Sequence, residues 1–381
     1  MKRKLFLLLC TLLGLLSSVQ EVKAQGWTGS EIGEGYALLY NVGTQKYFTR
    51  GNGWNTQASV GDECAAMTVY LDAISDGKYK IRTLTSKGVE CLSDGTVYTD
   101  QSIDKNSTWT FNEVDAVNHV YNIISAENHG DGSGKYLTAE GGTSTIVGPG
   151  NDGSTDNAKW KVFLYTDQQA KLLAAMPSAT ENDPLNVTAF IKDACFGAYQ
   201  DVALECWTVN ATNKNMNGGL MTNPCAETFQ YGGGTISQTI TIPNGKYVVK
   251  CQGFYRQDSG NETSNLYANG EKIALKVFNA EGENTADNMD GASTSFTAGY
   301  YENNLEVLVT GGSLEVGIQG QGGNWTCFDN FSLQYYGNAI SYYSPTDFTS
   351  NTEATGSTWY DFEVTTAGYY RISSTAAASI S

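Results

Sequence analysis

The chain carries aromatic rings beside amide and guanidinium side chains where expected strands end or turn. Trp54 stands in a polar, glycine-rich loop, and Arg256 closes a long strand pattern. The apolar face of a sugar ring packs on indole or phenol rings, while amide and guanidinium groups hydrogen-bond its hydroxyls. These side-chain types therefore indicate shallow sugar recognition. The candidate ligand-binding residues are Asn52, Trp54, Asn55, Tyr255, Arg256 and Trp325.

Residues suited to bond-breaking chemistry are scarce. His119 and His129 are the only histidines, which excludes any site built from several imidazoles, and both are expected in surface loops. The chain has no GxSxG turn and no phosphate-binding glycine loop. With 40 acidic residues, some pair will fall within the roughly 5–9.5 Å that glycosidases use, so acidic pairs alone predict nothing. No catalytic residue is predicted.

A threefold repeat organises the first third of the chain. Segments that begin at Tyr36, Tyr79 and Tyr121 start 43 and 42 residues apart, and two short strand patterns follow each of them. A repeated unit of this length buries its apolar face only by packing on its neighbours. Three such units without helices between them predict a closed threefold β-barrel, a β-trefoil. Because Trp109 and Trp160 hold equivalent repeat positions, they are expected in its core.

A short helix and a linker are expected after the trefoil, which is predicted over residues 30–166. Residues 167–176 are rich in helix formers and stop at Pro177. The polar stretch that follows carries a second proline and completes a linker over residues 167–185. The sequence therefore predicts two β domains joined by one short helix.

The second domain, residues 186–337, again shows strand patterns. Residues 235–242 alternate between apolar and polar types, a turn follows at residues 243–245, and residues 246–255 form another strand pattern, so a long hairpin is expected. Roughly eight strands without room for βαβ crossovers predict an antiparallel jelly-roll β-sandwich. The whole chain is therefore expected to be all-β. Further strands are expected at residues 265–268, 305–310, 313–319 and 327–335.

Two stretches of the second domain resemble a known module. Residues 251–256, Cys-Gln-Gly-Phe-Tyr-Arg, and residues 325–333, Trp-Thr-Cys-Phe-Asp-Asn-Phe-Ser-Leu, are similar to the jelly-roll accessory module of exported bacterial polysaccharide-processing proteins. Residues 46–54 resemble the ricin-like trefoils that precede such modules. The resemblance implies carbohydrate binding, and it implies a structural calcium ion at Asp329 with Glu227 as a partner.

The first 24 residues are typical of a secretory signal peptide. Three basic residues precede the apolar residues 5–16, and small residues follow near Ala24. The apolar run is about 12 residues long, against roughly 20 for a membrane-spanning helix. We therefore expect a secreted or cell-surface protein without a transmembrane segment in the mature chain.

The net charge limits the classes of partner that the chain can bind, and the cysteine count limits the disulfides that it can form. The 40 acidic and 23 basic residues give a net charge of −17, which disfavours nucleic acid and anionic membranes as partners. Removal of Cys10 with the signal peptide leaves seven cysteines, so at least one thiol is unpaired in the mature chain. One or two disulfides inside the second domain, where five of the seven lie, remain open.

The end of the chain, residues 338–381, indicates the incomplete start of a further β domain. We expect a polysaccharide-binding protein, or the accessory front part of a larger polysaccharide-degrading protein. One alternative is a glycoside hydrolase or lyase whose catalytic domain follows Ser381. The other is a structural or adhesion module without sugar affinity.

Overall fold

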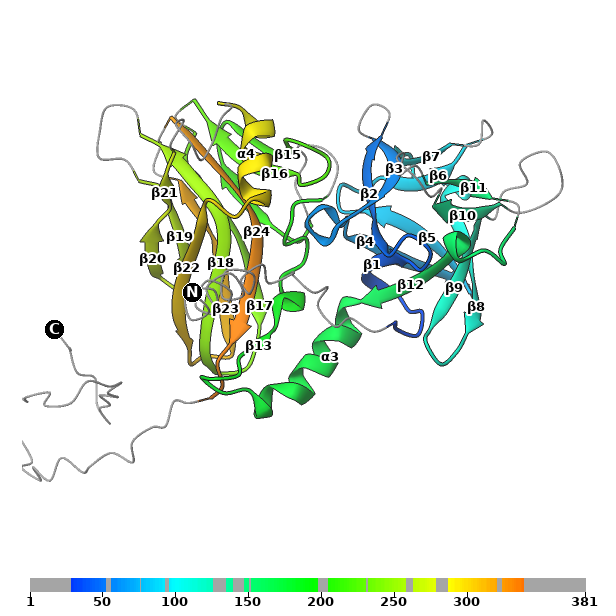
Figure 1. The fold of residues 1–381 in the computed structure, drawn as a ribbon, viewed down its shortest axis with the longest axis horizontal. Coiled ribbons are helices and arrows are strands. Elements are labelled where there is room, and N and C mark those ends of the chain that lie inside the picture. The colour runs from blue at the N-terminus through cyan, green and yellow to red at the C-terminus, as the bar shows by residue number, and fades with distance from the viewer. Residues whose placement is uncertain are drawn as a thin grey trace, which may run out of the picture.

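The chain folds into two β lobes joined by a helix (Figure 1). The expected all-β class is confirmed, since strands dominate both lobes. The computed structural model describes residues 29–52, 56–75, 77–92, 96–125, 135–139, 147–150, 152–197, 205–230, 232–257, 263–278, 287–320 and 324–338. The proposed signal peptide, His129 and the expected further β domain beyond Asn338 lie outside these residues.

The first lobe is one 12-stranded sheet that closes on itself. Strand β1 pairs with β4 and β12, and the pairs β4–β5, β5–β8, β8–β9 and β9–β12 complete a ring of six strands. The hairpins β2–β3, β6–β7 and β10–β11 add one arm per repeat. The strands are β1 (Gly35–Asn41), β2 (Lys46–Asn52), β3 (Gln57–Gly61), β4 (Val69–Ser75), β5 (Lys78–Thr83), β6 (Gly88–Cys91), β7 (Val97–Gln101), β8 (Thr108–Asp115), β9 (Val120–Ser125), β10 (Tyr136–Ala139), β11 (Val147–Gly150) and β12 (Lys159–Leu164). These pairings form the closed threefold barrel that the repeat predicts.

Equivalent side chains of the repeats fill the barrel. Trp109 and Trp160 are fully buried, as expected, and each indole Nε1 donates a 2.8 Å hydrogen bond, to Val89 O and to Leu137 O respectively. Both acceptors lie on the second strand of the same repeat. In the first repeat Met67 takes the equivalent place and is also buried. His119 lies in the turn before β9, as expected of a loop histidine.

Helix α3 (Tyr165–Ala175) follows β12 directly and leads into the 3₁₀ turn η4 (Met176–Ser178). It begins two residues before the expected helix. Gln168 Nε2 donates to Ser30 Oγ at 3.3 Å on the barrel side, and Gln169 Nε2 donates to Ala189 O at 3.0 Å on the other lobe. The helix therefore contacts both lobes.

The second lobe is a sandwich of two sheets with a shared apolar core. One sheet has the order β15-β16-β24-β18-β21, with β13 on β24 and β22 on β18, and the other has the order β14-β17-β23-β19-β20. All pairs are antiparallel except β18–β21. The elements are β13 (Leu185–Asn186), β14 (Thr208–Ala211), β15 (Lys214–Gly218), β16 (Cys225–Phe229), β17 (Gly234–Thr241), β18 (Gly245–Arg256), β19 (Asn265–Ala268), β20 (Glu271–Ala274), β21 (Lys276–Val277), α4 (Met289–Thr297), β22 (Glu302–Val309), β23 (Ser313–Gly320) and β24 (Trp325–Tyr335).

The predicted strands over residues 235–242 and 246–255 form as β17 and β18, but the prediction that they pair as a hairpin is wrong. β17 pairs with β14 and β23, whereas β18 pairs with β22 and β24 in the opposite sheet. The turn after β17 thus carries the chain from one layer to the other. Alternation marks one buried face on each strand, but it does not say whether two such faces share a sheet or oppose each other across a core.

Helix α4 was not expected from the sequence. It packs on the outer face of the seven-stranded sheet (Figure 1). There Ala292 and Phe296 join Phe254, Trp325 and Cys327 in a small apolar cluster. Asn288 caps the helix, since its Oδ1 accepts a 2.9 Å hydrogen bond from Gly291 N. The helix therefore covers part of a sheet face that would otherwise meet solvent.

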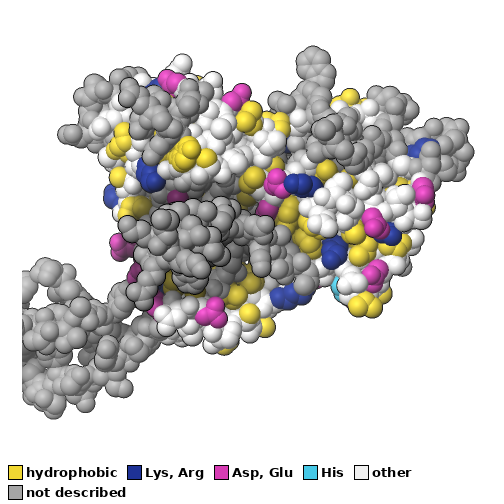
Figure 2. Space-filling model, viewed as in Figure 1, with side chains coloured by type: hydrophobic (Ala, Val, Ile, Leu, Met, Phe, Trp, Pro, Cys, Tyr) yellow, Lys and Arg dark blue, Asp and Glu magenta, His cyan; other side chains and the backbone are white. Residues whose placement is uncertain are grey.

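Charged side chains are scattered over the face shown in Figure 2, and the described residues form no broad basic patch there. Among the described residues, no helix has the length and apolar character needed to cross a membrane.

Candidate functional site

A cavity of about 360 Å³ opens beside the start of α4, at one end of the seven-stranded sheet. Its lining includes Glu227, Phe229, Arg256, Asn324 and Trp325. We call this cavity the α4 groove. The lining of the α4 groove also includes Gln230, in the turn after β16, and three residues at the start of α4, Asp287, Asn288 and Met289.

Strand register brings the central groove residues together. Phe229 on β16 lies opposite Trp325 on β24, and Trp325 lies opposite Arg256 on β18. Three residues far apart in sequence therefore form a row across adjacent strands. Glu227 is two residues before Phe229, so it shares that face of β16.

Arg256 is held from several sides. Its Nη1 forms an ion pair with Asp287 Oδ1, and its Nη2 donates to Asn324 Oδ1 at 3.3 Å. The guanidinium carbon lies 5.3 Å from the centre of the Trp325 ring and 5.9 Å from that of Phe278, within cation–π range. These contacts fix the orientation of the guanidinium group while its side chain keeps about a third of its surface exposed.

Trp325 and Glu227 form a second polar pair in the groove. Trp325 Nε1 donates a 2.6 Å hydrogen bond to Glu227 Oε2. Burial raises the pKa of the Glu227 carboxyl, and the indole hydrogen bond partly opposes that rise. The Trp325 ring itself is only 4% exposed and packs edge-on against Phe254 and Phe278. Trp325 therefore forms a wall of the groove, not an open stacking face.

Of the other candidate ligand-binding residues, only Tyr255 has a side chain that the structure describes. Tyr255 is buried in the sandwich core, because neighbouring residues on a strand point to opposite faces and Arg256 points outward. Tyr255 therefore lies on the opposite face of β18 from the α4 groove, and its contact with a ligand stays a prediction. Asn52 ends β2, but its side chain lies outside the described residues, as do Trp54 and Asn55.

The two carboxylates predicted to hold calcium have different surroundings. Glu227 lines the α4 groove, whereas Asp329 is fully buried further along β24, where burial raises its pKa well above the ordinary value. Within the part of the chain that the structure describes, no group of three or more His, Cys, Asp or Glu side chains is arranged to hold a metal ion.

Sequence reasoning missed the loop residues that complete the groove. Asp287 and Asn288 come from the start of α4, and Asn324 comes just before β24. One signal could have found the helix: Asn288 is a favoured N-cap residue, and Met289, Ala292 and Phe296 follow at helical spacing.

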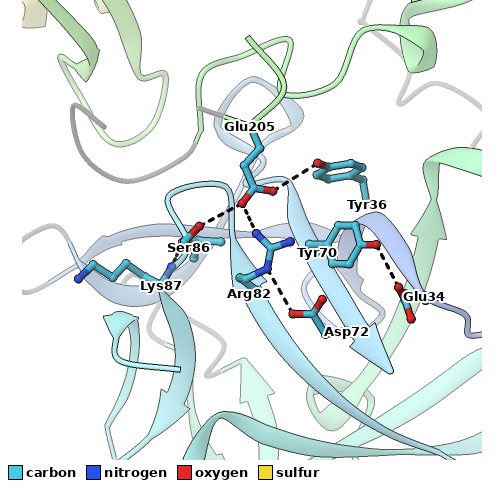
Figure 3. Close-up of polar contacts among 9 residues, drawn as sticks. Glu34, Tyr36, Tyr70, Asp72, Arg82, Ser86, Lys87 and Glu205 are labelled. Carbon is cyan, nitrogen blue, oxygen red and sulfur yellow. Dashed lines mark hydrogen bonds and ion pairs between the residues drawn. The ribbon is translucent and has the colours of Figure 1, made fainter. Parts of the chain in front are cut away.

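A separate polar cluster joins the two lobes. Glu205, from the sandwich lobe, contacts three barrel residues, as Figure 3 shows: Arg82 on β5, Ser86 in the turn after β5, and Tyr36 on β1. Glu205 Oε1 accepts a hydrogen bond from Ser86 Oγ at 3.1 Å, and Glu205 Oε2 accepts one from Tyr36 OH at 3.3 Å. Arg82 Nε also donates to Asp72 Oδ2 at 3.2 Å. We call this set the Glu205 cluster, and it fixes the sandwich against the barrel.

Comparisons with known proteins give partial likenesses to solved structures. The designed threefold-symmetric protein ThreeFoil is 22% identical with a TM-score of 0.27, over 34% of this chain and 97% of its own. The lectin SeviL, bound to asialo-GM1 saccharide, is 18% identical with a TM-score of 0.28, over 35% of this chain and 98% of its own. A GH43 β1,3-galactosidase is 19% identical with a TM-score of 0.29, over 36% of this chain and 28% of the enzyme. No family model and no curated protein matches the chain.

Proposed function

We propose that this protein binds carbohydrate through the α4 groove and that it performs no catalysis there. The observation that supports this most directly is the row formed by Phe229, Trp325 and Arg256, with Glu227 beside it. Together with the neighbouring Asn324, the row places guanidinium donors, carboxylate and amide acceptors and apolar ring edges on one surface. A sugar presents hydroxyls that both donate and accept hydrogen bonds, together with apolar C–H faces, so it matches such a mixed lining.

The groove's charges favour a neutral glycan over an anionic one. Arg256 is already paired with Asp287, and Glu227 adds a second carboxylate. An anionic polysaccharide would meet more negative than positive groups and would lose part of its hydration without compensation. The proposed ligand is therefore an uncharged oligosaccharide or polysaccharide.

Such binding fits an exported accessory module. A groove open to solvent gives modest affinity for a single sugar chain, yet tethering raises the effective concentration of an attached enzyme or cell surface near its polysaccharide. Export and attachment are part of this proposal, and they follow from the sequence features of residues 1–24 and from the resemblance described above.

A glycan array, followed by titration calorimetry with the best ligand, tests the proposal. The full chain is expected to retain a neutral glycan, and Arg256→Gln is expected to weaken binding about tenfold or more, because charge-assisted hydrogen bonds are lost. Lys272→Ala is the matched control, since it removes an exposed positive charge from β20 in the opposite sheet. Retention of no glycan, or equal affinity of Arg256→Gln and the unaltered chain, would contradict the proposal.

A further inference from the structure

Two thiols are in direct contact beneath helix α4. The Sγ atoms of Cys225 and Cys327 lie 3.6 Å apart, and both residues are fully buried. Cys225 Sγ also lies 3.7 Å from Met289 O and from Ser293 Oγ, both on α4. The pair therefore sits between the outer face of the seven-stranded sheet and the helix that covers it.

Strand register places these two cysteines on the same face of two paired strands. Cys225 begins β16 and Cys327 lies near the start of β24, in a pair whose register places Ala226 opposite Phe328. The cysteines are thus diagonal neighbours on one face of adjacent antiparallel strands. A disulfide bond is about 2.05 Å long, so the two sulfurs, now 3.6 Å apart, need to approach by roughly 1.5 Å. Because diagonal neighbours on paired strands typically lie about 7–8 Å apart, this approach takes side-chain rotation together with a small shift of the two strands.

We propose that Cys225 and Cys327 form a disulfide that cross-links β16 to β24 when the chain folds in an oxidising medium. The oxidant is a small or protein disulfide. One thiolate attacks it and releases one thiol; the second cysteine then attacks the mixed disulfide and releases the other. One S–S bond forms as one breaks, and the two electrons and two protons of the cysteines end on the two released thiols. This cross-link does not depend on whether the groove binds a glycan.

Helix α4 covers both sulfurs, so it limits the stage of folding at which the Cys225–Cys327 disulfide can form. Both sulfurs are inaccessible to solvent once α4 is in place, because the helix contacts Cys225 Sγ and both cysteines are fully buried. A disulfide oxidant has to reach a sulfur atom before exchange can start, so a fully buried thiol pair reacts slowly. Oxidation therefore belongs to folding, before α4 packs, and the folded reduced chain resists it.

Oxidative refolding of the full chain tests the proposal. The denatured, reduced chain is refolded with reduced and oxidised glutathione, its free thiols are alkylated, and its peptides are mapped by mass spectrometry without reduction. The expected result is a peptide pair joined through Cys225 and Cys327. Oxidised glutathione added to the already folded, reduced chain is expected to form the link roughly tenfold more slowly or slower still.

Two variants control for misfolding and for other pairings. Cys251→Ala alters a buried cysteine on the inner face of the same sheet and is expected to keep the link. Cys327→Ala is expected to leave Cys225 alkylated and to abolish the increase in thermal midpoint that oxidation gives the unaltered chain. Recovery of both cysteines as alkylated thiols after oxidative refolding, or their linkage to other cysteines, would overturn the proposal. Equal rates in the folded and refolding chain would overturn the protecting role of α4.

Discussion

Trp325 Nε1 and Glu227 Oε2 are joined by a 2.6 Å hydrogen bond across the pair of strands that forms one wall of the α4 groove. The bond consumes the only polar atom of the indole ring and aligns the carboxylate beside Arg256. Glu227 therefore presents its remaining acceptor capacity from a fixed position. Such fixing lowers the ordering cost of binding a ligand.

The Glu227 carboxyl should titrate above the ordinary glutamate range, about 4.3, because burial disfavours its charged form. The indole N–H resonance of Trp325, followed by NMR from pH 3 to 8, should shift with this titration, since the hydrogen bond is stronger to the ionised acceptor. Glu227→Gln should remove that titration. A Trp325 resonance that stays constant with pH in the unaltered chain would contradict the pairing.

Asp329 should make the protein less stable as pH rises. It is fully buried, its Oδ1 has no hydrogen-bond partner among the described residues, and burial raises its folded-state pKa well above the unfolded value near 3.9. Between about pH 4 and the folded-state pKa, the Asp329 carboxyl is protonated in the folded state but ionised in the unfolded state. The free energy of unfolding therefore falls as pH rises through this range. The loss is about 1.4 kcal/mol for each pH unit over which that proton is retained.

Asp329→Asn should therefore be more stable than the unaltered chain at pH 7, and the difference should shrink toward pH 4. Denaturant unfolding at several pH values measures it. Asp183→Asn, at an exposed turn residue, is the control and should follow the unaltered chain. Parallel stability profiles for Asp329→Asn and the unaltered chain would show that Asp329 does not carry the effect.

The Glu205 cluster should couple the two lobes. Glu205→Gln keeps a polar side chain of the same shape but loses the charge that Arg82 meets, so the free energy of unfolding should fall by about 1 kcal/mol. The barrel and sandwich transitions in calorimetry should also separate. Glu181→Gln breaks an exposed ion pair with Lys246 and should change stability by less than about 0.5 kcal/mol. Equal effects of the two substitutions would remove the coupling role of Glu205.

The sequence predicts the barrel well, because each repeat carries the same order of apolar positions. Trp109 and Trp160 could be assigned to the core from their equivalent places alone, and both are buried. In the sandwich, strand positions could be predicted but not their partners, as the separation of β17 from β18 shows. Helix α4 escaped prediction because Gly291 and its serine and threonine neighbours are weak helix formers, so burial against the sheet and the Asn288 cap stabilise it instead.

The α4 groove could be predicted only in part. Arg256 and Trp325 stand out because they flank loops at strand ends, and strand pairing brings them together. Tyr255 lies on the inner face of β18, and the sequence could not show this because the buried side of a strand depends on the layer that the strand joins. Asp287 and Asn324 reach Arg256 through contacts across long sequence separations, for which the sequence gives no local sign.

The most direct test of glycan binding is an NMR titration of the full chain with the neutral oligosaccharide that the array selects. The indole N–H of Trp325 and the guanidinium N–H groups of Arg256 should show the largest shifts, and Arg256→Gln should abolish the Trp325 response at the same ligand concentration. Binding that leaves both groups unshifted, or shifts confined to residues of the barrel, would contradict the assignment of the α4 groove as the glycan site.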